Sequence, residues 1–72
     1  NIRSNIVAPG ITETALLAAV PDRQKKVAAA QNPLRRIGRP ADVAGAVAYL
    51  VSEDGAYVNG ETLVVNGGAL MI

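Results

Sequence analysis

The chain carries one nearly continuous β-forming run, which a glycine pair ends: Glu61-Thr62-Leu63-Val64-Val65-Asn66-Gly67-Gly68. Because its apolar residues follow one another without alternation, the run predicts a strand over residues 61–65 that is buried on both faces, as in a parallel sheet. A second, shorter β-forming segment over residues 2–8 is closed by Pro9 and Gly10. More than 50 residues separate the two segments, which favours a crossover through helices within an α/β sheet.

The first part of the intervening chain carries helical signals. Two short helices are predicted, over residues 15–20 and 21–31. Thr12 or Thr14 would cap the first of them, because a threonine hydroxyl accepts hydrogen bonds from the unpaired amides of a first turn. Pro21 suits the first position of the second helix, where its missing N–H would have no partner in any case.

The clearest helix is predicted over residues 40–52. Pro40 suits its first turn, and Asp42 lies near the positive end of the helix dipole. Apolar side chains recur at helical spacing, namely Val43, Ala44, Val47, Ala48, Leu50 and Val51. Gly45 and the alanines would let this helix approach another backbone closely.

The composition indicates a weak core for a chain of 72 residues. Half of the residues are hydrophobic, but 13 residues are alanine and the only aromatic residues are two tyrosines. Two strands do not make a sheet that is stable alone. The chain also starts inside a β-forming segment and without Met, so we expect a piece of a longer protein.

Composition also argues against several functions. A net charge of +1 with 18% charged residues excludes a disordered polyelectrolyte. The sequence has no Cys and no His, so it lacks disulfides, thiolate metal sites and the commonest metal ligand and general base. No apolar run approaches the ~20 residues of a membrane span. The lack of Cys fits a reducing compartment, and we expect a cytoplasmic protein.

Three consecutive blocks resemble the short-chain dehydrogenase/reductase family, in its order and at its spacing, and the likeness is nearest to 3-oxoacyl-carrier-protein reductase-like members. The blocks are Ile2-Arg3-Ser4-Asn5-Ile6-Val7-Ala8-Pro9-Gly10 with Thr14, Pro33-Leu34-Arg35-Arg36-Ile37-Gly38-Arg39-Pro40-Ala41-Asp42-Val43-Ala44, and Ser52-Glu53-Asp54-Gly55-Ala56-Tyr57-Val58-Asn59-Gly60-Glu61-Thr62-Leu63-Val64-Val65-Asn66-Gly67-Gly68. The resemblance implies that residues 1–72 form the C-terminal segment of one Rossmann-type domain, a doubly wound parallel sheet. Residues 11–32 would be its lid. Asn59 and Asn66 depart from the family's pattern, where Thr and Asp are commoner, but both keep a polar side chain that suits a turn.

The resemblance also implies a nicotinamide cofactor, NAD(P)(H), with NADP slightly favoured. In the family, the loop that matches Pro9 and Gly10 passes the nicotinamide. Backbone groups at Thr12 would bond the carboxamide, and Thr14 would lie near a phosphate. Proline fixes φ and glycine lacks a side chain, so a flat ring can approach the backbone there. The residues alone also allow Pro9 and Gly10 only to end a strand, and Thr14 only to cap a helix.

The predicted lid matches the family's variable substrate lid. Ile11, Leu16 and Leu17 would line an apolar substrate wall that excludes water, or they would pack on a neighbouring helix. Six of the seven cationic residues fall between Arg23 and Arg39. An acidic acyl-carrier protein or a phosphate could bind there, or the cations form a solvated surface. Nucleic-acid binding is not expected, because no aromatic residues lie among these charges.

In the family, the elements that match residues 40–52 and 61–65 build one interface of a homo-dimer or homo-tetramer. Ordinary packing on the parent sheet is the alternative. The intact protein would then be an NAD(P)-dependent oxidoreductase that transfers hydride between the cofactor and a small-molecule carbonyl or alcohol.

The chain itself offers no catalytic and no metal-binding residue. It has no Gly-rich phosphate loop, and the family's Tyr-x-x-x-Lys pair is absent: Tyr49 is followed by Glu53, and Tyr57 by Glu61. We therefore expect the chain alone to be inactive. The alternative is a non-enzymatic binding or oligomerisation module that pairs through residues 40–52, and such a module would have to fold by itself.

Overall fold

The structure, a computed structural model, describes residues 2–15 and 17–70. Its elements are β1 (Ile6–Pro9), the 3₁₀ helix η1 (Leu17–Ala19), α1 (Asp22–Gln31), α2 (Pro40–Val51), the 3₁₀ helix η2 (Glu53–Gly55) and β2 (Thr62–Val65). The two strands pair in parallel, with Ile6 opposite Thr62 and Pro9 opposite Val65. The predicted parallel pairing of two strands joined through helices is therefore confirmed.

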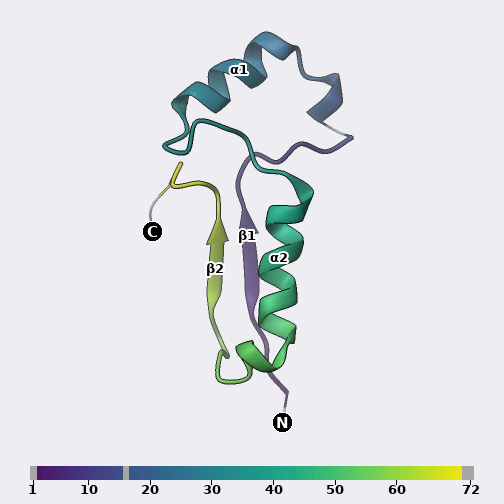
Figure 1. Ribbon diagram of the computed structural model, residues 1–72, viewed down its shortest axis with the longest axis vertical. Coiled ribbons are helices and arrows are strands. Elements are labelled where there is room, and N and C mark those ends of the chain that lie inside the picture. Colours follow the sequence, from purple (N-terminus) through teal and green to yellow (C-terminus); the bar gives the residue numbers. More distant parts are fainter. Residues whose placement is uncertain (1, 16, 71–72) are drawn as a thin grey trace.

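The elements form an elongated body of 47 × 24 × 15 Å. Helix α2 runs along the sheet and contacts both strands, whereas α1 lies beyond the carboxyl ends of the strands (Figure 1). Among the described residues, Leu50 on α2 is the only buried hydrophobic side chain, with 7% of its surface exposed. The core is therefore the seam between α2 and the strands, and it is small.

Strand β1 is shorter than the predicted strand over residues 2–8. The residues before it are bound to the loop before β2 by a backbone bond from the Gly60 N–H to Ser4 O at 2.8 Å and by side chains. The Arg3 guanidinium donates to the carbonyls of Leu50 and Gly55, both at 2.8 Å. The Asn5 side chain donates to Val58 O at 3.1 Å and accepts from the Glu61 N–H at 2.9 Å. These contacts hold the incoming chain beside the loop before β2 without extending the sheet.

The helix predicted over residues 15–20 is replaced by the single turn of η1. The Val20 N–H donates to Leu17 O at 3.0 Å, an i to i+3 bond of the 3₁₀ type. A proline at 21 disfavours helical backbone in the residue before it, which limits the segment to this tighter turn. Pro21 is the residue before α1 and not its first helical position.

The other helix boundaries follow the sequence closely. Helix α2 begins at Pro40 as predicted and ends at Val51, one residue before the predicted end, with Ser52 as its C-cap. The Asp42 carboxylate accepts a 2.8 Å hydrogen bond from the Arg39 N–H, so the acid holds the first turn of the helix as its position suggested.

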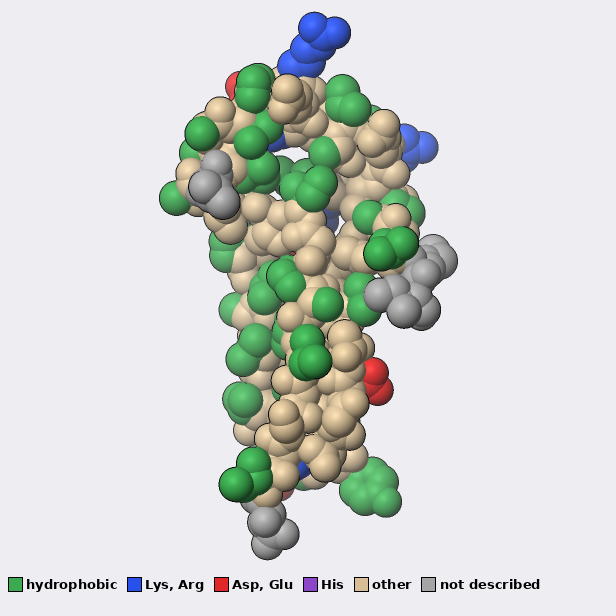
Figure 2. Space-filling view, turned by 180° about the vertical axis from the view of Figure 1, so that it is seen from behind, with side chains coloured by type: hydrophobic (Ala, Val, Ile, Leu, Met, Phe, Trp, Pro, Cys, Tyr) green, Lys and Arg blue, Asp and Glu red, His purple; other side chains and the backbone are tan. Residues whose placement is uncertain are grey.

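Much apolar surface stays exposed. The chain exposes 5571 Å², whereas a compact protein of 7.4 kDa would expose about 4,200 Å². Hydrophobic side chains are spread over the face shown in Figure 2. Large ones that are more than half exposed include Ile2, Ile6, Ile11, Leu34, Val51, Tyr57 and Leu70. The total exposed area therefore exceeds what a compact chain of this size exposes, and these large apolar side chains are part of it.

Candidate functional site

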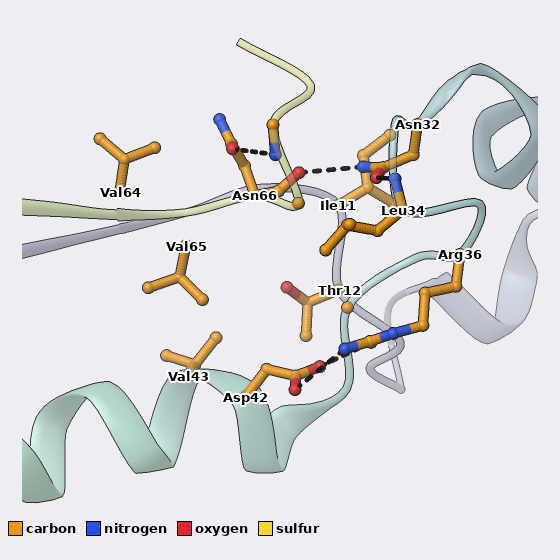
Figure 3. A pocket seen from close by; sticks show the side chains of 13 residues that line it. Ile11, Thr12, Asn32, Leu34, Arg36, Asp42, Val43, Val64, Val65 and Asn66 are labelled. Atoms are coloured by element: carbon orange, nitrogen blue, oxygen red, sulfur yellow. Dashed lines mark hydrogen bonds and ion pairs between the residues drawn. The ribbon is translucent and has the colours of Figure 1, made fainter. Parts of the chain in front are cut away.

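A pocket of about 330 Å³ opens at the carboxyl ends of β1 and β2 (Figure 3). The loop after β1, the connector between α1 and α2, and the turn after β2 form its walls, and Val43 adds a side chain from α2. In open α/β sheets, ligands bind outside the carboxyl ends of the strands. The pocket therefore lies at the edge where such folds hold their ligands.

The loop after β1 runs tightly against the turn after β2. The Gly10 N–H donates to Val65 O at 2.9 Å, and a Cβ added at Gly10 would lie 2.6 Å from the Asn66 Cβ. A side chain at position 10 would therefore collide with the end of β2. The absence of a side chain at Gly10 therefore lets the loop after β1 pack against the end of β2.

A short parallel bridge to the connector orients Thr12. The Gly38 N–H donates to Ile11 O, and Gly38 O accepts from the Glu13 N–H, both at 2.8 Å. Because a parallel bridge joins Gly38 to the two neighbours of Thr12, the N–H and C=O of Thr12 itself point away from Gly38. The Thr12 hydroxyl donates to Gly10 O at 3.0 Å. This hydroxyl does not cap a helix, contrary to one of the two alternatives from the sequence.

The structure brings some of the predicted site residues together and leaves others apart. Ile11 and Thr12 line the pocket, and Ile11 is 58% exposed. Thr14 is exposed outside it, and its hydroxyl accepts a long 3.4 Å bond from the Leu17 N–H, as expected for a cap. Pro9, Gly10 and Leu17 do not line the pocket. Leu16 lies outside the described residues.

An ion pair in the pocket wall was not predicted. The Arg36 guanidinium donates two hydrogen bonds to the Asp42 carboxylate, from Nη1 to Oδ2 at 2.8 Å and from Nη2 to Oδ1 at 3.2 Å. The Arg36 bonds, followed by the Arg39 N–H, lower the pKa of Asp42 from 3.8 to about 2. The same contact raises the pKa of Arg36. Both groups stay charged at neutral pH, so this pair fixes the connector and does not transfer protons.

Two asparagines, Asn32 and Asn66, also line the pocket, which the sequence did not predict. The Asn32 Nδ2 donates to Asn66 O at 2.9 Å, and the Asn32 Oδ1 accepts from the Leu34 N–H at 2.9 Å. The Asn66 side chain accepts from the Gly68 N–H at 2.9 Å (Figure 3), and its Nδ2 donates to Leu70 O at 2.8 Å. The Asn-Pro and Asn-Gly-Gly sequences indicate turns, but no local signal shows that one turn binds the other.

Residues 2–15 and 17–70 hold no group of three His, Cys, Asp or Glu side chains that could bind a metal ion. In the same residues, every helix is too short or too polar to cross a membrane.

The chain is similar to known proteins over nearly its whole length. A family model described as enoyl-(acyl carrier protein) reductase matches residues 1–69. The acetoacetyl-CoA reductase of Acinetobacter sp. (strain RA3849) is 54% identical over 71 residues, which are 99% of this chain and 29% of that protein. The 3-oxoacyl-[acyl-carrier-protein] reductase of Vibrio cholerae is 50% identical over 68 residues, 94% of this chain and 28% of that protein.

The fold has a solved counterpart. A short-chain dehydrogenase/reductase from Brucella melitensis, titled glucose/ribitol dehydrogenase, matches with a TM-score of 0.90 and 38% identity, covering 97% of this chain and 29% of that one. The chain thus spans about 29% of the length of these relatives. The α/β, Rossmann-type fold expected from the sequence is confirmed. With a family match over residues 1–69 and oxidoreductases as its named relatives, the chain belongs to the short-chain dehydrogenase/reductase family.

Proposed function

We propose that these residues form the C-terminal segment of an NAD(P)-dependent oxidoreductase that reduces the carbonyl of a 3-oxoacyl substrate. The observation that carries the proposal is the family match over residues 1–69. The names of the relatives supply the substrate class, since they are acetoacetyl-CoA and 3-oxoacyl-[acyl-carrier-protein] reductases. Small-molecule thioesters and acyl-carrier substrates are both within this proposal, and we place the whole enzyme in the cytoplasm.

The loop after β1 fits one end of a nicotinamide cofactor. A carboxamide carries one acceptor oxygen and an NH₂ donor. The N–H and C=O of Thr12 would match them as donor and acceptor, both from the same residue. Pro9 and Gly10 direct the loop to this position, and Thr14 would lie on the phosphate side. When bound, the cofactor supplies or accepts the hydride. We expect NADPH to serve better than NADH.

Residues 11–32 would form the substrate lid. Ile11 contributes an exposed apolar side chain at the pocket, and Leu16 and Leu17 would extend this wall. An apolar wall excludes water from the reacting carbonyl.

The Asp42 carboxylate, with its pKa of about 2, has no proton to give at neutral pH. We therefore assign the catalytic groups to the part of the protein outside this chain, and we expect the chain alone to be inactive.

The same protein would assemble with copies of itself through α2 and β2. On α2, Val47 and Tyr49 are each 44% exposed and Val51 is 74% exposed. Apolar side chains that a helix leaves exposed in this way are typical of surfaces that another chain covers. A homo-dimer or homo-tetramer is the assembly that we propose. A self-standing module that pairs through α2 is the weaker candidate, because Leu50 is the one buried hydrophobic side chain in the described residues.

The test is NADPH consumption by the full-length protein that contains this segment, with acetoacetyl-CoA as the substrate. The proposal predicts loss of NADPH with one 3-hydroxyacyl product formed for each NADPH oxidised. The isolated chain at equal molar concentration should not exceed the enzyme-free blank. A full-length protein that oxidises neither NADPH nor NADH with this substrate would contradict the proposal, and so would turnover by the isolated chain.

A further inference from the structure

Helix α1, the main body of the proposed lid, is held in place almost entirely from its two ends. It packs against no other helix or strand of the described chain, and none of its residues is buried. Near its start, the Lys25 ammonium lies 3.4 Å from the Glu13 carboxylate, which belongs to the loop after β1. At its other end, Asn32 is the C-cap. The position of α1 therefore depends on a few polar contacts.

Of the two contacts at the ends of α1, the one made by Asn32 spans more of the sequence. The Asn32 Nδ2 donates to Asn66 O at 2.9 Å, across 34 positions of sequence, while its Oδ1 accepts from the Leu34 N–H at 2.9 Å. The two partners fix the orientation of the amide, because a carbonyl requires the NH₂ group and an N–H requires the oxygen. One side chain thus joins the end of α1, the connector and the turn after β2.

The turn after β2 is built to receive this side chain. Gly67 has a φ of +65°, which favours glycine. A Cβ there would lie 2.5 Å from the Asn32 Oδ1, so only a glycine leaves room for the amide. Asn32, Asn66 and Gly67 all line the pocket at the carboxyl ends of the strands. The contact therefore lies in the wall of the candidate site.

We propose that Asn32 is a positioning residue for the lid, and that its bond to Asn66 O sets where α1 lies over the substrate. The inference rests on the proposed reductase function and goes beyond it, because it assigns a specific role to a residue of this chain. Loss of the bond frees the carboxyl end of α1, so the closed lid is less populated and the substrate binds less tightly. The cofactor loop is bridged to Gly38 independently of Asn32 and keeps its place.

Three Asn→Asp substitutions in the full-length protein separate this role from simpler effects. Asn32→Asp keeps an acceptor for the Leu34 N–H but replaces the donor to Asn66 O with an oxygen that repels it. Asn5→Asp breaks the same kind of two-bond amide bridge at the opposite end of the sheet. Asn59→Asp adds the same charge where only the acceptor oxygen is used, for the Ser4 N–H.

With NADPH and acetoacetyl-CoA as probes, Asn32→Asp should raise KM for acetoacetyl-CoA about tenfold, which corresponds to ~1.4 kcal/mol. Its kcat and its Kd for NADPH should stay within about twofold of the parent protein, since a twofold change is only ~0.4 kcal/mol. Asn5→Asp should lower Tm but leave KM unchanged, and Asn59→Asp should leave KM unchanged. A KM for Asn32→Asp equal to that of the parent would overturn the inference, as would an equal rise in Asn5→Asp.

Asn32→Ser keeps the test decisive if the aspartate variant does not fold. A serine hydroxyl can still accept from the Leu34 N–H, but it is too short to reach Asn66 O and adds no charge. It should show the same rise in KM, and a normal KM would refute the proposal. A parent protein without NAD(P)H-dependent reduction would overturn both the proposed function and this inference, whereas an active parent with unaffected variants would overturn the inference alone.

Discussion

At the residue scale, one carboxylate joins the start of α2 to the connector before it. Asp42 accepts from the Arg39 N–H and from two nitrogens of Arg36. The pair is partly exposed, with 27% of the Asp42 side chain and 44% of the Arg36 side chain accessible. Exposed pairs contribute modestly to stability, but this one is held by two parallel bonds and fixes the connector that lines the pocket.

The ion pair predicts a pH-dependent stability difference between the full-length protein and its Asp42→Asn variant. Folding lowers the pKa of Asp42 from 3.8 to about 2, so the unfolded chain takes up the proton first. The stabilisation is complete above about pH 5 and is lost as the pH falls through 3.8 towards 2. Thermal unfolding by circular dichroism should therefore show a lower Tm for the variant at neutral pH and a narrowing difference in acid.

Asp54→Asn is the matched control, because Asp54 makes no ion pair within residues 2–15 and 17–70. Its Tm difference from the parent should stay nearly constant over the same range. A constant difference for Asp42→Asn would contradict the assignment of the lowered pKa to this pair.

The close approach at Gly10 predicts a loss of both stability and cofactor affinity in Gly10→Ala. The added methyl would meet the Cβ and Cα of Asn66 at 2.6 and 2.9 Å, and neither atom can swing away as a side-chain end would. Overpacking of this kind costs about 1–3 kcal/mol. The displaced loop should bind NADPH more weakly in a fluorescence titration of the full-length protein.

Gly45→Ala supplies the comparison, since its added methyl meets nothing within 4 Å in the described chain. It should leave the Kd for NADPH unchanged. If Gly10→Ala binds NADPH as tightly as the parent does, the loop after β1 is not part of the cofactor site.

At the element scale, Arg3 ties the segment before β1 to the end of α2. Its Nη1 donates to Leu50 O, in the last turn of the helix, and to Gly55 O in η2, both at 2.8 Å. The last carbonyls of a helix have no partner within the helix, and a cation there also suits the helix dipole. The Arg3 side chain thus joins the segment before β1 to α2 and η2 at the amino end of the sheet.

We expect Arg3→Met to destabilise the full-length protein by about 1–2 kcal/mol, because hydrogen bonds from charged groups are the stronger ones and this group is partly exposed. Urea unfolding would measure the loss, and Arg3→Lys should recover part of it with a single ammonium group. NADPH affinity should not change, since Arg3 precedes β1, whereas the pocket is at the carboxyl ends of the strands. A loss of NADPH affinity as large as the loss of stability would show that Arg3 also affects the pocket at the other end of the sheet.

The elements were largely predictable from the sequence, because their signals are local. The run at residues 61–65 became β2, and the periodic stretch at 40–52 became α2. The predicted strand at 2–8 was too long. The residues before Ile6 are held by the Arg3 and Asn5 side chains together with a backbone bond to Ser4 O, and a strand pattern does not reveal the side-chain contacts. The segment at 15–20 formed only η1, because Pro21 limits it.

The candidate site was predictable only in part. Ile11 and Thr12 follow a Pro-Gly turn that stands out in the sequence, and both line the pocket. The ion pair of Arg36 with Asp42 and the bond from Asn32 to Asn66 O were missed. These contacts join ordinary polar residues across a turn or across two distant segments, and neither composition nor periodicity encodes such a pairing.

At the scale of the whole molecule, the chain exposes more total surface than its size explains. Its 5571 Å² exceeds by about a third the area of a compact protein of 7.4 kDa. The chain fits part of a solved relative with a TM-score of 0.90, yet it covers 29% of that relative. The remaining surface is available for the other strands and helices of such a domain.

The isolated chain is therefore expected not to fold cooperatively. Two paired strands, with Leu50 as the one buried hydrophobic side chain among residues 2–15 and 17–70, do not offset the conformational entropy of the ordered residues. Its thermal melt by circular dichroism should lack a sigmoidal transition, and the same residues within the full-length protein should unfold as one cooperative unit. A cooperative transition in the isolated chain would favour the self-standing module over the reductase segment.

A crystal structure of the full-length protein with NADP⁺ bound would show directly whether the Thr12 backbone binds the nicotinamide. The distance to measure runs from the Thr12 N to the carboxamide oxygen of the nicotinamide. We predict a direct hydrogen bond of about 2.9 Å, with the Thr12 C=O accepting from the carboxamide NH₂. A nicotinamide bound away from residues 9–14, with no contact to Thr12, would show that this loop does not hold the cofactor.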